Sequence, residues 1–556
     1  MKAMLKGFLS VTLLLTGAIF YTKADDNNSC SSTSSCNNTN NNDSCDSSCG
    51  STDSTNNNCK QQCNVSGYVN GTRTHFSLRG QEINSVSRLT ATTSKQHRCD
   101  VPRFNGTVDG TFRVSKTLNG KNIARYLFGK NELTYGNECD GTFDIYSVNF
   151  GTTASGKVKF CPEIKNFIGD INIWLGMDEF LCGLWAMIDV PITYTRWTLG
   201  MQDTNTFNPL SINAEFAPDL VSTTTVLVPY PNLKSAWADD RPFGDAPRMA
   251  CGRICGRQSN TGISGIRFDL GYDIIRNPSN YFGISALFIT PTGNRPSDEF
   301  LFNAVSGSQF MWQAGVGLVA GYRLWNSCDD NQNLSIYFDG TITHLFKAKQ
   351  ARLFALKKKD GTPNPLSSFL LLKHFDPNTG AFIKLQRAVN VLCCETRINA
   401  RIQTDLSLML QYDLNHFSSG LGWNFWLRDT ERVHKNSTTN NNNGSTCNDN
   451  DCVIPANTYG IKGSTLVTDT DTMSNATIGN CGAVDATTVF LTTADIDKCS
   501  VLNPRAFSNK IFAWVGYNWS KENWQPYVAF ETGFEFGNQN KAADQWEIMF
   551  KGGVAY

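Results

Sequence analysis

Apolar and polar residues alternate one by one along several unusually long segments of this chain. Between residues 397 and 416, the register from Ile398 to Leu414 is almost entirely apolar, whereas the interleaved register is polar or charged. A period of two predicts a β-strand, because successive side chains of a strand point to opposite faces. The segment is far longer than a usual globular strand of about five or six residues. It fits a transmembrane barrel strand, which turns apolar side chains toward lipid and polar ones toward a wet lumen.

The same alternation recurs in four further segments, at residues 184–194, 264–275, 312–325 and 527–536. Many of their apolar faces begin or end in Trp, Tyr or Phe, as the aromatic girdles of membrane barrels do. A soluble protein can contain one such strand, but the recurrence favours a membrane barrel over a soluble fold.

The last strand of the chain carries a further signal. Apolar, aromatic or glycine residues occupy every second position up to the final residue, namely Trp546, Ile548, Phe550, Gly552, Val554 and Tyr556. This ending resembles the terminal strand of Gram-negative outer-membrane barrels, which the barrel-assembly machinery recognises. The alternative is an ordinary last strand, although the ends of soluble domains usually fray.

The predicted connections alternate between short and long. Short connections are expected near residues 177–182, 277–280, 327–333, 417–420 and 521–523, and longer ones at 196–263, 291–309, 348–396, 434–509 and 537–545. Outer-membrane barrels combine short periplasmic turns with long extracellular loops. We therefore predict an all-β transmembrane antiparallel β-barrel of 12–16 strands, with 14 as the best value. Residues 64–135 are harder to interpret and add either two to four strands or an interior segment.

The N-terminus predicts export. Lys2 and Lys6 precede an apolar stretch from Phe8 to Phe20, and Thr22-Lys23-Ala24 supplies small residues for signal-peptide cleavage near Ala24. A buried N-terminal helix is the alternative. We expect residues 1–24 to be a signal peptide, residues 25–63 a disordered segment rich in Cys, Asn and Ser, and residues 64–556 the barrel in a bacterial outer membrane.

An exported chain can form disulfides. The candidate disulfide cysteines are Cys30, Cys36, Cys45, Cys49, Cys59, Cys63, Cys251 and Cys255. Zinc is the alternative for the first six, but their segment contains no His, and oxidation favours disulfides. We expect Cys251 and Cys255 to form a local disulfide, with a redox site as the alternative. Adjacent Cys393 and Cys394 are expected to pair with other partners rather than with each other.

Composition narrows the function. The 49 basic and 49 acidic residues give zero formal net charge, which argues against a nucleic-acid partner. After residue 20 no apolar run reaches the roughly 18 residues of a membrane helix. The six His are not paired at metal-ligand spacing, and the nearest candidate for a barrel enzyme site is His416 near Ser418 and Ser419, at a predicted periplasmic turn. We expect no enzyme activity, no cofactor and no metal.

The inward register of the predicted strands supplies the candidate pore lining. Its charged residues are Arg267, Asp269, Asp273, Arg323, Arg397, Arg401, Asp405, Asp413, Arg428, Glu531 and Glu535. These five cations and six anions predict weak charge selectivity. The alternative is that they form salt bridges inside a barrel closed by a loop or by the N-terminal segment.

Several stretches fit one family, namely Phe76–Gln81, Ile192–Trp197, Pro291–Pro296 and Gly422–Arg428. With the strand pattern, the chain resembles the porin-like major outer membrane proteins of obligate intracellular, chlamydia-like Gram-negative bacteria. The resemblance implies passive diffusion of small solutes, surface exposure and oligomerisation. The Cys-rich segment is similar to a disulfide-linked envelope, whereas its length departs from a usual porin start.

The sequence thus predicts an outer-membrane porin for small hydrophilic solutes. The alternative is a surface structural or adhesion protein, in which the barrel is an anchor and the long loops and Cys-rich leader carry the function. The expected partners are outer-membrane lipid, the barrel-assembly machinery, and either further copies of the chain or disulfide-linked envelope proteins.

Overall fold

The protein is described by a computed structural model. It describes residues 73–82, 84–98, 104–136, 143–144, 156–203, 231–241, 247–329, 331–357, 366–433, 452–462, 488–519, 524–537 and 544–556. The predicted signal peptide and the six candidate cysteines from Cys30 to Cys63 lie outside these residues. Within the described residues, no helix has the length and apolarity needed to cross a membrane.

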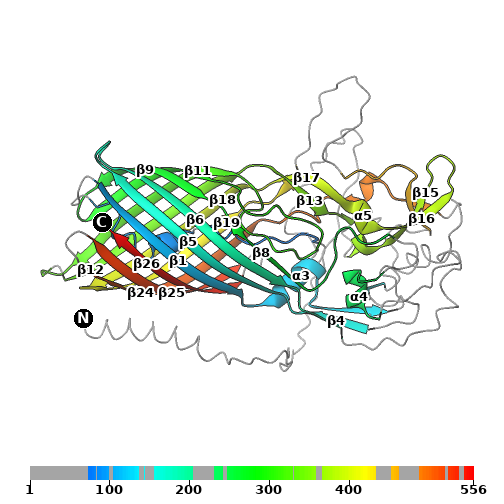
Figure 1. The fold of residues 1–556 in the computed structure, drawn as a ribbon, viewed down its shortest axis with the longest axis horizontal. Helices are drawn as coiled ribbons and strands as arrows, with labels where there is room; N and C mark the ends of the chain where they lie inside the picture. The colour runs from blue at the N-terminus through cyan, green and yellow to red at the C-terminus, as the bar shows by residue number, and fades with distance from the viewer. Residues whose placement is uncertain are drawn as a thin grey trace, which may run out of the picture. The chain divides into compact units, whose positions relative to one another are not determined.

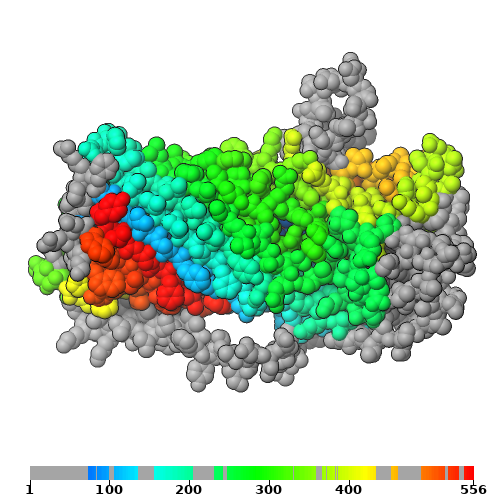
Figure 2. All heavy atoms as spheres, in the orientation of Figure 1, coloured from blue at the N-terminus to red at the C-terminus, as the bar shows by residue number. Residues whose placement is uncertain are grey.

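Twelve antiparallel strands form a closed ring (Figure 1). They are β1 (Phe104–Thr117), β5 (Glu163–Met177), β6 (Leu184–Thr198), β9 (Arg267–Arg276), β10 (Asn280–Ile289), β11 (Gln313–Asn326), β12 (Gln332–Leu345), β18 (Arg401–Leu414), β19 (Phe417–Arg428), β24 (Ala506–Asn518), β25 (Gln525–Gly537) and β26 (Gln545–Ala555). The ring closes because β1 pairs with β26 on one side and with β5 on the other. Figure 2 shows the C-terminal strand, in red, side by side with β1, in blue.

The predicted antiparallel barrel is confirmed, but the described ring has twelve strands rather than the best value of fourteen. The region 64–135 contains both an interior segment and one barrel strand, β1. The single strand predicted over residues 397–416 is wrong. It is divided into β17 (Cys393–Asn399) and β18, because Arg401 takes a left-handed backbone conformation with φ 54°. The alternation continues through this break, so the pattern did not reveal it.

The connections alternate in length as predicted. Short turns join β5 to β6, β9 to β10, β11 to β12, β18 to β19 and β24 to β25, all at the end of the barrel where Tyr556 lies. The connections at the opposite end are mostly long. We call these two ends the turn end and the loop end.

The outer wall is apolar and the inner wall is polar. In β5, for example, Phe167, Ile171 and Leu175 face outward and are 37–51% exposed, whereas Asp170 and Asn172 point inward and are buried. Outward apolar side chains on the other strands continue this surface, including Phe112, Phe268, Ile284, Val316, Ile342, Leu408, Ile511, Val528 and Phe550. Exposed apolar side chains on the strands of a closed barrel suit contact with lipid.

The wall changes partner strand at one proline. The first half of β6 pairs with β9 up to Asp189, and the second half pairs with β8 (Arg257–Ile263) from Ile192 onward. Pro191 lies at this change and accepts a hydrogen bond from the Ser264 backbone N–H. Proline has no N–H to return, so the ladder cannot continue evenly there.

The long connections fold into a cap at the loop end (Figure 1). Its elements are α3 (Gly120–Phe128), β2 (Glu132–Gly136), β3 (Phe143–Asp144), β4 (Gly156–Phe160), β7 (Met201–Asp203), α4 (Leu233–Ala238), β13 (Ala348–Leu353), β14 (Ala355–Leu356), η4 (Ser367–Phe369), β15 (Leu371–Phe375), β16 (Phe382–Arg387), α5 (Ala388–Leu392), β17, β20 (Arg432–Val433), β21 (Tyr459–Lys462), β22 (Thr488–Phe490), η5 (Thr493–Asp495) and β23 (Ile496–Asp497). They pair into small sheets such as β13-β17-β20. The cap therefore has its own hydrogen-bonded framework.

Two disulfides join three loops of the cap. Cys393 pairs with Cys251, and the adjacent Cys394 pairs with Cys452. The prediction that these neighbours bond to other partners is confirmed. The predicted Cys251–Cys255 disulfide is wrong, since Cys255 is a free thiol. The Ala250 backbone N–H donates to the Asn390 side chain, and this contact brings the Cys251 loop beside α5 and Cys393.

Candidate functional site

The barrel lumen contains a segment of the chain itself. Residues 73–82 and 84–97, which we call the plug, include the short helix α2 (Ser85–Leu89). The plug begins at the loop end, where the Thr74 N–H donates to Ser500 O in the cap. It reaches the strand ends near the turn end, where the His97 Nδ1 lies 2.9 Å from Asp273. The plug therefore runs along most of the length of the barrel.

The cap holds the plug where the plug begins, at the loop end. Arg73 donates to the backbone oxygen of Cys499 at 2.6 Å, and Arg428 donates to the Ser77 hydroxyl at 2.5 Å. Beside them, the fully buried Arg352 and Glu431 form an ion pair at 3.5 Å. Because these contacts come from both the cap and the barrel, they fix the place where the plug enters the lumen.

Electrostatics favour an ionised Glu431 next to the plug. Burial opposes ionisation, but the guanidinium groups of Arg352 and Arg428 overcome it and lower the pKa of Glu431 to about 2. His75 lies in the same cluster, and burial together with Arg352 holds its pKa well below the usual value. The cluster is thus built around a carboxylate and a neutral imidazole.

Arg79 contacts three groups of the wall in the middle of the lumen. Its guanidinium donates to Asp405 at 2.7 Å and to the Asn424 side-chain oxygen at 2.9 Å. Glu535 of β25 lies 3.5 Å away on the other side. Asp405 also accepts from the Ser85 hydroxyl at 2.7 Å. One plug cation therefore links β18, β19 and β25.

Arg88 makes the second charged contact. It binds Asp339 on β12 and lies 3.8 Å from Asp269 on β9. Asp269 is itself held by two hydrogen bonds from Arg267, at 2.6 and 2.7 Å. The lumen charges on this wall thus form a connected network with the plug.

One side of α2 makes apolar contacts instead. Val86, Leu89 and Ala91 pack in a buried cluster with inward side chains of the wall, namely Tyr337, Met409, Phe512, Trp514, Tyr527 and Ala529. The same part of the plug also makes polar contacts: Thr90 donates to Glu531 at 2.6 Å, and the Lys551 ammonium donates to Ser87 O at 2.8 Å. The plug is therefore held by both ion pairs and apolar packing.

Three aromatic side chains surround His97 at the end of the plug near the turn end. The His97 ring stacks on Tyr281, with centroids 4.7 Å apart, and meets the edges of Trp174 and Trp185. The Trp185 N–H donates to Asp273 at 3.0 Å, so one carboxylate receives both the indole and the imidazole. These contacts hold the plug close to the turn end.

Little space remains beside the plug at Arg79. A cavity of about 20 Å³ lies between the plug and the wall and is lined in part by Arg113, Lys510 and Glu547. This volume holds about one water molecule. A cavity of this size is too small for a hydrated solute.

The eleven predicted pore residues differ in what they contact. Asp269, Asp273, Asp405, Arg428, Glu531 and Glu535 contact the plug directly, Arg267 acts through Asp269, and Asp413 contacts Gln411 and Ser418 of the wall. The other three are placed differently. Arg323 and Arg401 are exposed near opposite ends of their strands, and Arg397 lies in the cap strand β17.

The sequence prediction missed an equally charged part of the lumen. Its inward pairs are Arg113–Asp170 at 3.6 Å, Lys510–Glu547 at 3.1 Å and Lys551–Asp109 at 3.4 Å. Their signal was present, because residues 105–116 alternate as clearly as the other strands. The inward register of the last strand, between the apolar positions already identified, also carries Glu547 and Lys551.

The terminal strand β26 closes the ring. Its alternate residues Trp546, Ile548, Phe550, Gly552 and Val554 face outward, and Phe550 is 57% exposed. Tyr556 follows the strand, and its N–H donates to Gly106 O of β1. Recognition of this strand by the assembly machinery stays a prediction.

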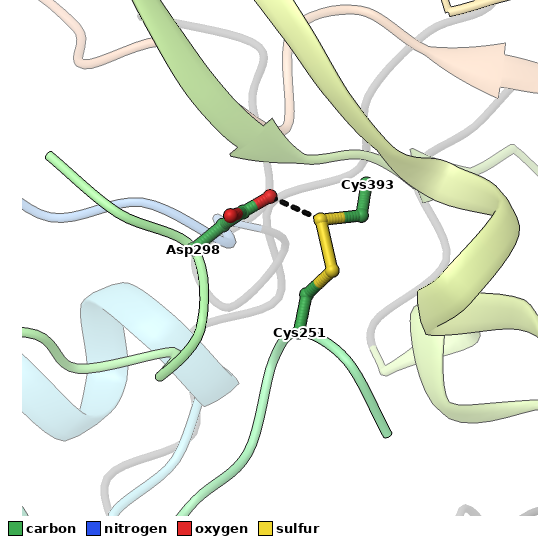
Figure 3. Close-up of side chains that lie close together, drawn as sticks. All are labelled: Cys251, Asp298 and Cys393. Atoms are coloured by element: carbon green, nitrogen blue, oxygen red, sulfur yellow. Dashed lines mark hydrogen bonds between the residues drawn. A yellow bond between two sulfur atoms is a disulfide. The ribbon is translucent and has the colours of Figure 1, made fainter. Parts of the chain in front are cut away.

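Two chemical alternatives from the sequence can be located. His416 lies in the turn between β18 and β19, next to the Tyr517 ring. Among the described residues, the group with metal-ligand spacing is Cys251, Asp298 and Cys393. Figure 3 shows that the two sulfurs are joined as a disulfide, so neither offers a thiolate to a metal. Burial raises the pKa of Asp298, and its carboxyl oxygen Oδ2 lies close to the Cys393 sulfur.

Comparisons with known proteins find outer-membrane barrels among solved structures. No family model and no curated protein matches the chain. An outer membrane channel from Pseudomonas putida F1 has 8% identity and a TM-score of 0.33, covering 82% of this chain and 97% of its own. The toluene transporter TodX from Pseudomonas putida has 8% identity and a TM-score of 0.30, covering 88% and 97%. The transport unit of the Escherichia coli autotransporter AIDA-I has 8% identity and a TM-score of 0.29, covering 85% and 94%. At these values the likeness carries no argument about function, and the resemblance to porins of obligate intracellular bacteria stays a prediction.

Proposed function

We propose that this protein is an outer-membrane channel for small hydrophilic solutes that its own N-terminal plug closes. The observation that carries the proposal is a polar barrel lumen occupied by a segment of the chain, with Arg79 and Arg88 paired to wall carboxylates. Water can replace polar contacts of this kind when the plug moves, whereas it replaces a fully apolar core poorly.

The size of the barrel supports a channel. Side chains alone fill a barrel of about eight strands, and such a barrel is sufficient for an anchor. Twelve strands enclose more space, which this chain fills with its plug. Removal of the plug would leave a lumen lined by paired cations and anions, such as Arg113–Asp170 and Lys510–Glu547. A balanced lining of this kind supports weak charge selectivity.

Conductance in planar bilayers tests the proposal. The native protein is compared with a variant in which a Gly/Ser linker of equal length replaces residues 73–97. We expect the native protein to be mostly closed, and the variant to conduct steadily with little preference between cations and anions. Heat-modifiable gel migration shows that both are folded. If both are folded and neither conducts, the channel proposal is wrong.

A surface structural protein is the second candidate. The observation in its favour is the cap, in which adjacent Cys393 and Cys394 bind two other loops covalently. Such cross-links stiffen an exposed surface and limit unfolding of long loops. For this function, the folded linker variant would remain silent in bilayers, while the intact cap would still bind a surface partner.

A further inference from the structure

Three basic residues lie side by side on the outer wall at the loop end. Lys116 of β1 is directly opposite Lys165 of β5, and Lys165 is directly opposite Arg196 of β6. All three belong to the outward register, which alternates with buried lumen residues. We call Lys116, Lys165 and Arg196 the basic row. The strands that carry it, β1, β5 and β6, face the viewer in Figure 1.

Like charges directly opposite one another destabilise a sheet. One anion of the same face, Glu163, offsets them in part: its carboxylate lies 2.7 Å from Lys116, 2.9 Å from Lys165 and 4.0 Å from Arg196. Three cations therefore share one carboxylate. The Arg196 Nε–H is buried and has no acceptor among the described residues. The row thus retains an excess of positive charge for a further anion.

The position of the row indicates which anion fits. Directly below it on the same strands, toward the turn end, the outward residues are apolar, including Phe112, Phe167 and Ile192, which are 52%, 37% and 51% exposed. Trp546 lies directly opposite Lys116 on β26 and also faces outward. The basic row therefore marks the edge of the lipid-facing belt on the cap side.

We propose that the basic row binds the phosphate of a phosphorylated glycolipid in the outer leaflet, with the acyl chains of that lipid against the apolar belt below. The proposal rests on the proposed function, because it requires the loop end to face outward from the cell. Arginine and lysine are suited to phosphate oxygens, and a lipid satisfies the cations and the apolar wall together. A free phosphate ion would use only the cations.

Binding of a purified lipid tests this proposal. Folded full-length protein in a zwitterionic detergent is titrated with a bisphosphorylated diglucosamine lipid, and the bound fraction is measured by native mass spectrometry. The triple variant Lys116→Gln, Lys165→Gln, Arg196→Gln should bind at least 10-fold more weakly. The double variant Lys157→Gln, Lys349→Gln is the matched control, because these lysines pair with Glu132 and Glu395 within the cap. It should bind as the native protein does.

Glu163 gives a test of opposite sign. If the row only stabilises the fold, Glu163→Gln should leave lipid binding unchanged or weaken it. If the row binds phosphate, the same substitution removes the competing carboxylate and should tighten lipid binding several-fold. Equal binding by the native protein and the triple variant would overturn the proposal, and so would displacement of the lipid by an equal concentration of inorganic phosphate.

The outcome can be separated from that of the channel proposal. The basic row faces away from the lumen, so the triple variant should keep the native conductance and the native response to plug replacement. Loss of lipid binding with unchanged conductance supports the glycolipid site. A protein that never conducts but binds the lipid through the basic row would contradict only the channel.

Discussion

Arg79→Met is expected to open the channel without unfolding the barrel. In the closed state Arg79 donates to Asp405 and Asn424 at 2.7 and 2.9 Å, and all of these groups lie inside the lumen. Methionine keeps an unbranched apolar stem but removes the guanidinium, whose central carbon lies 5.9 Å from the centre of the Trp426 ring. Removing one partner of a buried ion pair costs about 3–5 kcal/mol. Water in an open lumen would hydrate Asp405 again, so most of this cost falls on the closed state.

A cost of about 3 kcal/mol changes an equilibrium by roughly 100-fold or more. The ratio of open to closed time in single-channel recordings should therefore rise by about that factor in Arg79→Met. Adding Asp405→Asn removes the stranded carboxylate and should return the ratio to within about tenfold of the native value. Arg323→Met, at an exposed position near the turn end, is the control and should change nothing. A folded Arg79→Met protein that stays as closed as the native one would refute the reasoning.

Three further predictions follow from the cap and the wall. Cys251→Ser should make the cap loops more sensitive to protease, by loss of a cross-link with a typical contribution of about 2–4 kcal/mol, whereas Cys255→Ser should not. The ion pairs of Glu431 with Arg352 and Arg428 should weaken in acid. The pKa of Glu431 is about 2 in the fold against an ordinary value of 4.5, so its stabilisation is present above pH 4.5 and lost as the pH falls toward 2, and Glu431→Gln should abolish that part of the pH dependence of thermal unfolding. Ile171→Lys should lower the yield of heat-modifiable barrel, because a lysine on the lipid face costs about 2–4 kcal/mol at the bilayer centre, whereas Val453→Lys on the exposed surface of the cap should not. An unchanged protease pattern, an unchanged pH profile or a normal barrel yield would each count against the corresponding contact.

The alternation of side chains predicted most of the wall because lipid and water select different residues at every second position. Ile266 to Ile274 and Trp546 to Val554 illustrate this, since no other packing demand competes with the period of two. The same principle explains the miss at Ala400 and Arg401. A local change of φ divides the strand without changing the order of apolar and polar residues.

The plug and the disulfides could not be predicted in the same way. Arg79 and Arg88 pair with carboxylates on strands more than 180 residues away in sequence, so no local spacing of residues predicts these ion pairs. The Cys251–Cys393 bond joins residues 142 apart, whereas the predicted partner Cys255 was chosen because it is near in sequence. Contacts of this kind depend on the closed topology rather than on local pattern.

The central claim is that residues 73–97 close the lumen, and a reversible lock tests it most directly. The hydroxyl oxygens of Ser85 in the plug and Ser407 in β18 lie 2.7 Å apart. The double variant Ser85→Cys, Ser407→Cys should form a disulfide that holds the plug, with the native protein and Ser85→Cys carried through the same oxidation and reduction. We predict no channel openings in the oxidised double variant and openings at the native frequency after reduction. Equal conductance before and after reduction would contradict the claim that the plug closes the channel.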